Sequence, residues 1–184
     1  MTRAPVLAAS LIAFGVLSAA PAAAERLVTS LSTHQVLIGS NFTGTELVLF
    51  GSIERDAATV PRRGGYDLVV TVIGPREGMV ARRKGRFLGI WTNVESHTFE
   101  RAPAYLAVLS NRPIDALASA VVRRRMEIGL RNVPLTPANE AQPPEAFRDA
   151  LIRLRTERGL YREEASAITF LTRNLFRARI TIPA

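Results

Sequence analysis

The sequence predicts a mainly β protein, an immunoglobulin-like β-sandwich that carries a two-helix insertion at about 113–158. Between residues 26 and 109, short runs rich in Val, Ile, Phe and Thr are punctuated by Gly, Pro and Asn, a pattern typical of strands and turns. From residue 113 onward, apolar residues recur every three or four positions, which indicates helices. After residue 158 apolar and polar residues alternate again, so the helices are expected to interrupt a sheet.

Strands account for most of the chain before the helices. Residues 45–53 and 66–73 are almost continuously apolar, as expected for strands that are covered on both faces. The strands expected before the helices are 26–31, 35–39, 45–53, 66–73, 79–83, 86–92 and 97–109, and residues 167–171 are expected to return to strand after them.

A hairpin is expected where basic residues surround a glycine. Residues 82–86 are expected at its tip, with Gly85 free to adopt a positive φ. Trp91, together with Phe87, Ile90 and Phe99, is expected in the core of the sandwich rather than in an aromatic ligand cage.

Two helices are expected between the strands. The first follows Pro113 and is capped by Asn111, and Gly129 stops it. Its apolar residues share one face, and they are Ile114, Leu117, Ala118, Val121, Val122 and Met126. The second runs from about Glu145 to Arg158 and precedes Gly159. Its inward-facing residues are expected to be Phe147, Ala150, Leu151 and Leu154.

The last strand alternates between apolar and polar residues. Phe176, Ala178 and Ile180 are expected on its buried face. Because the chain stops at Ala184, directly after a strand that needs a partner, we expect a C-terminal truncation. The alternative is a natural end on an edge strand.

The first 24 residues have the pattern of a secretory signal peptide. Arg3 is the only charge, an apolar run follows, and Pro21 precedes Ala22-Ala23-Ala24, an A-x-A cleavage signal. An uncleaved membrane anchor is the competing interpretation. Cleavage leaves residues 25–184 as one exported, periplasmic domain, and it lowers the formal net charge from +8 to +7 because Arg3 is lost.

Composition excludes several classes of chemistry. The chain has no cysteine, so thiol catalysis and thiolate metal sites are impossible. The two histidines, His34 and His97, match no metal-ligand spacing and are expected to have surface or hydrogen-bonding roles. There is no G-x-S-x-G elbow, P-loop or G-x-G-x-x-G motif. We therefore expect no enzyme activity, no cofactor, no metal, no nucleotide and, given export, no nucleic-acid partner.

Several ordered runs of the chain resemble a known family. They are residues 36–51 (VLIGSNFTGTELVLFG), 67–75 (DLVVTVIGP), 90–93 (IWTN), 105–113 (YLAVLSNRP) and 175–178 (LFRA). With these runs the chain resembles the uncharacterised alphaproteobacterial putative transmembrane proteins, which are often encoded beside a sulfite-exporter-like permease. The resemblance implies a signal peptide, a periplasmic β-rich domain, a closing strand region and a C-terminal membrane helix.

The chain departs from that pattern in one respect. No stretch after residue 24 reaches the roughly 18 consecutive apolar residues that a membrane span requires. The resemblance brings no established activity and no catalytic residues.

Clusters of basic residues are the candidate binding sites. Their planar guanidinium groups suit oxyanions and anionic headgroups, whereas a solvated surface is the plainer interpretation. The candidate residues are Arg82, Arg83, Lys84, Arg86, Arg123, Arg124 and Arg125, and Arg62-Arg63 form a further basic pair.

Two functions remain open at this point. The first is a non-enzymatic periplasmic accessory domain that works beside an inner-membrane permease or on membrane headgroups. It predicts basic residues on a convex surface and an exposed apolar patch on the helical insertion. The alternative is a small-oxyanion-binding module, which predicts arginines gathered in a concavity.

Overall fold

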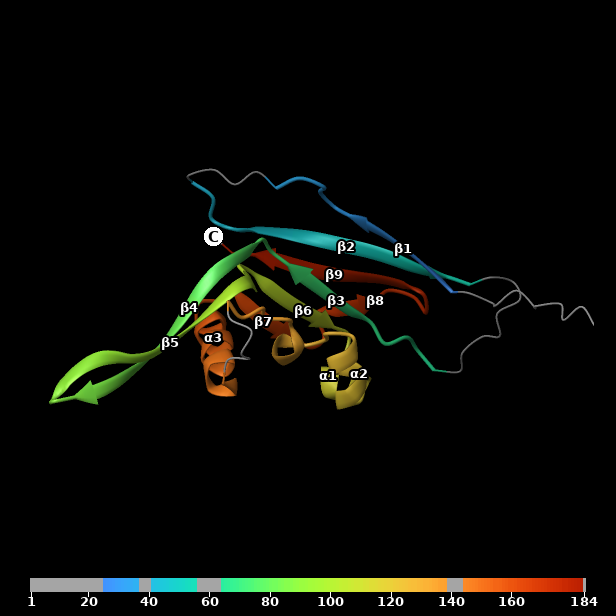
Figure 1. The fold of residues 1–184 in the computed structure, drawn as a ribbon. Helices are drawn as coiled ribbons and strands as arrows, with labels where there is room; N and C mark the ends of the chain where they lie inside the picture. The colour runs from blue at the N-terminus through green and yellow to red at the C-terminus, as the bar shows by residue number, and fades with distance from the viewer. Residues whose placement is uncertain (1–24, 37–40, 56–63, 139–143, 184) are drawn as a thin grey trace, which may run out of the picture.

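The computed structural model describes residues 25–36, 41–55, 64–138 and 144–183, and it confirms a mainly β fold with a helical insertion (Figure 1). The expected signal peptide, most of the expected strand 35–39 and the basic pair Arg62-Arg63 lie outside the described residues. The strands are β1 (Arg26–Leu31), β2 (Thr45–Glu54), β3 (Val69–Ile73), β4 (Arg76–Phe87), β5 (Ile90–Pro103), β6 (Leu106–Ser110), β7 (Tyr161–Glu164), β8 (Ile168–Phe170) and β9 (Leu175–Ile182).

Two of the sheets pack face to face. One has the order β1-β2-β9-β8 with antiparallel pairs throughout, and the other has the order β3-β6-β7. Their facing side chains form one apolar core that includes Ile53, Phe176, Ala178, Ala107 and Leu109. The sandwich is therefore confirmed. The immunoglobulin-like connectivity stays a prediction, and the parallel pairing of β6 with β7 departs from the antiparallel sheets of that fold.

Strand β6 separates two apolar cores. All five of its residues are buried, which explains the continuous apolar run LAVLS up to its last residue. Ala107 and Leu109 face the core between the sheets, whereas Leu106 contributes to a second core on the other side. In that second core, Phe99, Phe147 and other residues from β5, α3 and the connecting segments cover β6.

The last strand lies inside its sheet. Phe176, Ala178 and Ile180 are buried and alternate with exposed residues, as the sequence predicts. However, β9 pairs with β2 on one side and with β8 on the other. The expectation that this strand lacks a partner is therefore wrong.

The helices form the connection between the parallel strands β6 and β7, which a short turn could not join. They are α1 (Ile114–Leu117), α2 (Ala120–Arg125), the single-turn η1 (Leu130–Asn132) and α3 (Glu145–Glu157). Helix α3 matches the second expected helix: Phe147 and Leu151 are buried, and Gly159 follows with φ +70°. Leu154, expected to face inward, is 44% exposed.

The first expected helix is broken into two. The backbone of Ala118 is extended, and the Ser119 side chain accepts a hydrogen bond from the Val122 N–H, so a new helix begins there. Asn111 does not cap a helix, because its side chain accepts from the Leu68 N–H at 2.9 Å. The spacing of apolar residues alone does not locate the break, since serine is compatible both with the interior of a helix and with an N-cap.

Strands β3 to β6 form one long, bent ribbon. The pairing Ile73↔Leu106 continues through the hydrogen bonds from Gly74 N–H to Tyr105 O and from Ala104 N–H to Pro75 O, both within 2.8 Å, into the β4–β5 pair. At the bend, a Cβ on Gly74 would lie 3.0 Å from the Tyr105 backbone nitrogen, so this position favours glycine. The β4–β5 half of the ribbon extends away from the sandwich (Figure 1).

We predict that Gly51→Ala destabilises the sandwich by about 1–3 kcal/mol, as overpacking of a core does. A Cβ on Gly51 would lie 2.3 Å from the Phe176 ring, which packs over it from the neighbouring strand. Gly78→Ala in β4 is the matched control, because a Cβ there meets nothing within 4 Å. Urea unfolding of both variants measures the difference, and equal stabilities would contradict the packing.

Candidate functional site

The far end of the β4–β5 ribbon is a tight hairpin turn. Phe87 pairs with Ile90, so Leu88 and Gly89 form a two-residue loop, and both have positive φ, +49° and +84°. This is the backbone pattern of a type I′ hairpin turn. The expected tip at residues 82–86 is wrong, because those residues lie within β4.

Gly85 has a packing role in place of the expected turn role. It pairs with Thr92 in the ribbon, and a Cβ on it would lie 2.8 Å from a methyl carbon of Val94. Beside it the register shifts, with Arg83 opposite Glu95 and Lys84 opposite Asn93, so that Val94 is the extra residue of a β-bulge. The polar residues and the glycine at 82–86 have the composition of a turn, but in the structure they form part of a strand with a β-bulge opposite.

The hairpin end is apolar and exposed. Phe87 is 66% exposed, Leu88 87%, Ile90 72% and Trp91 65%. We call these four residues the apolar tip. The expectation that Trp91, Phe87 and Ile90 lie in the core is wrong, whereas Phe99 is fully buried as expected. The reason is the length of the ribbon: β4 has 12 residues and β5 has 14, and from Arg82 to Val94 none is buried.

Basic side chains lie directly behind the apolar tip. Arg83 forms an ion pair with Glu95 at 2.9 Å, and the Arg86 guanidinium lies 5.8 Å from the centre of the Trp91 ring. We call the set Arg82, Arg83, Lys84 and Arg86 the basic collar. Residues 82–94 contain these four basic residues and no acidic one.

The root of the hairpin is attached to helix α3 and to the connector before it. Glu95 also contacts His97 at 3.3 Å, and the His97 ring lies 4.4 Å from that of Phe147 in α3. His97 therefore has the hydrogen-bonding role expected for it. The Glu100 N–H donates to Thr136 O at 2.9 Å, so the segment between η1 and α3 lies along the edge of β5.

A second set of charged groups holds the other side of α3. Arg155 forms an ion pair with Glu77 at 2.5 Å and lies 6.0 Å from the centre of the buried Tyr161 ring. Burial raises the pKa of Tyr161, whose hydroxyl donates to Pro103 O at 2.8 Å. Desolvation likewise lowers the pKa of Arg148, which donates to backbone carbonyls of η1 and the residue after it. Arg155 and Tyr161 therefore hold the root of the hairpin, and Arg148 holds α3 to η1.

A groove of about 440 Å³ lies between the hairpin and α3. The basic side chains on it are Arg82, Arg83 and Lys84 from β4 and Arg153 from α3, and the acidic residue on it is Glu95. Pro144, Phe147 and Leu154 contribute apolar surface. The structure therefore brings three of the expected site residues together in a concavity.

The expected residues on the helical insertion behave differently. Arg123 forms an ion pair with Asp115 of α1, whereas Arg124 and Arg125 are exposed. Beside them, Val121 and Met126 are 65% exposed and Val122 is 42% exposed. We call Val121, Val122 and Met126 the α2 patch. The Arg123–125 cluster is thus an internal ion pair plus two solvent-facing cations beside apolar surface.

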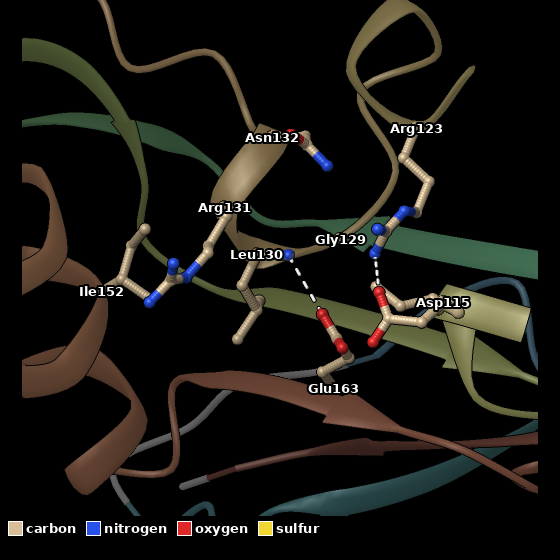
Figure 2. A pocket seen from close by; sticks show the side chains of 9 residues that line it. Asp115, Arg123, Gly129, Leu130, Arg131, Asn132, Ile152 and Glu163 are labelled. Atoms are coloured by element: carbon tan, nitrogen blue, oxygen red, sulfur yellow. Dashed lines mark hydrogen bonds and ion pairs between the residues drawn. The ribbon is translucent and has the colours of Figure 1, made fainter. Parts of the chain in front are cut away.

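A second hollow, of about 370 Å³, lies beneath the helical insertion. Figure 2 shows its charged groups facing one another: Arg123 points to Asp115, and the Glu163 carboxylate accepts from the Leu130 N–H at 3.2 Å. These contacts already engage Asp115, Arg123 and Glu163 in the structure. In the described part of the chain, no three His, Asp or Glu side chains gather as a possible metal site.

We predict that Trp91 fluoresces like tryptophan in water. It is the only tryptophan of the chain, so emission reports on the hairpin end alone. Acrylamide should quench it efficiently in the folded protein, and unfolding in guanidinium should change its emission maximum only slightly. A blue-shifted, protected emission from the folded chain would instead place Trp91 in a core.

The comparisons with known proteins give one match. Neither the curated proteins nor the solved structures gave a match to the chain. Among the described residues, no helix has the length and apolar character needed to cross a membrane. Residues 26–184 match a family model described as a putative transmembrane protein, which confirms the resemblance. The chain belongs to this putative transmembrane protein family.

Proposed function

We propose that the chain is a non-enzymatic accessory domain, exported to the periplasm, that holds an integral inner-membrane protein through the α2 patch. The candidate partner is the sulfite-exporter-like permease that the resemblance associates with this family. The observation that carries the proposal is the exposure of Val121, Val122 and Met126 on the helical insertion, beside Arg124 and Arg125.

The α2 patch has the composition of a contact surface. Helix α2 has only six residues and buries none of them, so its apolar side chains contribute little to the core. Protein interfaces combine such an apolar centre with a polar rim in which arginine is enriched. Arg124 and Arg125 provide that rim here.

The helix is also held in place. Ser119 caps it, Arg123 forms an ion pair with Asp115 in α1, and the Ile128 N–H donates to Arg123 O at 2.9 Å. A patch that is ordered before binding loses less conformational entropy when a partner docks. Membership of a transmembrane protein family supports a partner in the membrane.

We predict that Val121→Asp combined with Met126→Ser weakens copurification with the permease at least ten-fold, since burying a new carboxylate in an interface is unfavourable. Leu171→Ser is the control, because Leu171 is 48% exposed but lies between β8 and β9. The measurement is quantitative pull-down of the permease encoded beside the gene, coexpressed with each variant. If the wild-type chain fails to retain the permease, or the double variant retains it fully, the proposal fails.

A small-oxyanion-binding module is the second candidate function. The four basic side chains on the groove between β4 and α3 favour it, because arginine donates paired hydrogen bonds to oxyanions. Glu95 weakens the case, since it already forms an ion pair with Arg83.

Calorimetry with sulfate and sulfite tests the groove. We predict that Arg82→Gln and Arg153→Gln each weaken anion binding about ten-fold or more, the loss of one charge-assisted hydrogen bond. Arg124→Gln is the matched control, because Arg124 is a cation outside the groove. The absence of binding heat with the wild-type chain, or equal losses in all three variants, would exclude this candidate.

A further inference from the structure

We propose that the apolar tip inserts into the interfacial region of a bilayer rich in anionic lipid, with the basic collar on the headgroups. The tip and the collar lie on the β4–β5 hairpin, whereas the proposed permease contact lies on α2. The two proposals therefore rest on different surfaces and fail separately.

The apolar side chains lie on both faces of the hairpin. Directly paired residues share a face of a ribbon, and the neighbouring pair occupies the opposite face. Phe87 and Ile90 therefore share one face, and Trp91 lies with Arg86 on the other. A flat protein surface would cover one face and leave the other in water. A fluid apolar medium surrounds both faces at once, and so removes all four tip side chains from water.

Leu88 occupies a position that the turn itself does not favour. Its φ of +49° is a conformation in which Asn or Asp is several-fold enriched, and Asn-Gly is the preferred pair in such a turn. At 87% exposure its side chain contributes almost no packing within the chain. Neither turn geometry nor packing accounts for a leucine here, whereas contact with an apolar phase outside the chain does.

The basic collar complements an anionic headgroup layer. Its four cations follow one another closely along β4, and Glu95, which forms an ion pair with Arg83, offsets only one of them. Arg86 is two residues from Leu88, roughly 7 Å along a strand, and Lys84 is four residues away, roughly 13 Å. Amphipathic elements lie about 5–10 Å deep in the interface, so the apolar tip fits that depth with the collar at headgroup level.

The collar and tip also have the side-chain chemistry of an interface. Tryptophan is enriched where acyl chains meet headgroups, because its ring is amphipathic. The Arg86 guanidinium lies over the Trp91 ring, which keeps a cation close to it on one face of the hairpin. Long arginine and lysine stems extend along apolar surface while their charged ends remain in water.

Vesicle binding followed by Trp91 emission tests the proposal. The full chain, including residues 1–24, is expressed and purified from the exported fraction. It is then mixed with protein-free vesicles of phosphatidylcholine, alone or with one quarter phosphatidylglycerol. We expect a blue shift of Trp91 emission and loss of acrylamide quenching with the anionic vesicles, and quenching of Trp91 by brominated acyl chains. Removing one collar charge should weaken binding roughly five-fold at low salt.

Two variants separate insertion from folding. Leu88→Asn combined with Ile90→Ser keeps Trp91 as the reporter and gives the turn its preferred Asn-Gly pair, so we expect an unchanged or higher Tm together with at least a ten-fold loss of vesicle binding. Arg82→Gln with Lys84→Gln tests the collar. Leu171→Ser is the control, an exposed apolar residue outside both the hairpin and the α2 patch, and it should bind vesicles like the wild type.

Three results would overturn the proposal. The first is no Trp91 shift with anionic vesicles, and the second is binding that the Leu88→Asn, Ile90→Ser variant retains. The third is a Trp91 shift that appears only with native membranes and never with protein-free lipid, which would assign the tip to a protein receptor. None of these results bears on copurification of the permease through α2.

Discussion

The burial of β6 on both faces is the constraint on which the other elements depend. Its five residues are buried, and they lie between two cores that differ in composition. The face that carries Ala107 and Leu109 requires a second sheet, and β2 and β9 supply it. The opposite face requires cover from elsewhere, and the connection from β6 to β7 supplies it as α3 and the segments around η1. The parallel β6–β7 pair is what makes that connection long enough to do so.

The same constraint explains why the hairpin end has no core. The ribbon that includes β6 is covered near its root, where Ala81, Phe99 and Ala102 join the core under α3. From Arg82 to Val94 no residue of the ribbon is buried, and beyond the groove beside α3 the ribbon extends away from the other described elements (Figure 1). Its backbone hydrogen bonds are satisfied by the antiparallel partner, so the exposed length does not leave the backbone polar groups without partners. The strand pairing, which resumes after each of its two register shifts, also makes the tip part of the same folded unit as β6.

The sequence predicts helices and strands best where an element buries one face, because its apolar residues then recur with the period of that element. β9 shows the predicted alternation and α3 buries Phe147 and Leu151, because in both elements one sequence period coincides with one buried face. β1 has the predicted bounds although it buries none of its residues. The sequence does not predict how far a strand extends beyond its core, since residues on both faces of a free ribbon are unconstrained by burial. For that reason the sequence pattern favours Trp91 in the core and a hairpin tip around Gly85, whereas the turn is at Leu88 and Gly89. Of the candidate residues, Arg82, Arg83 and Lys84 gather in the groove with Arg153 of α3, which is too distant in sequence for spacing to reveal it.

When the hairpin tip and the α2 patch belong to one folded unit, each needs a lower binding affinity than it would need alone. The helices and the root of the hairpin both lie on the side of β6 away from β2 and β9 (Figure 1). A hairpin seated in a bilayer confines the domain to the membrane surface, and there docking on an integral membrane protein becomes a contact at high effective concentration. Neither the hairpin tip nor the α2 patch then needs an affinity that would hold the domain alone. This arrangement requires the tip to be stiff, because a flexible arm would lose much of that advantage. The antiparallel pairing of β4 with β5, which extends to Phe87 with two register shifts and is fixed at its root by His97 and Phe147, provides the stiffness.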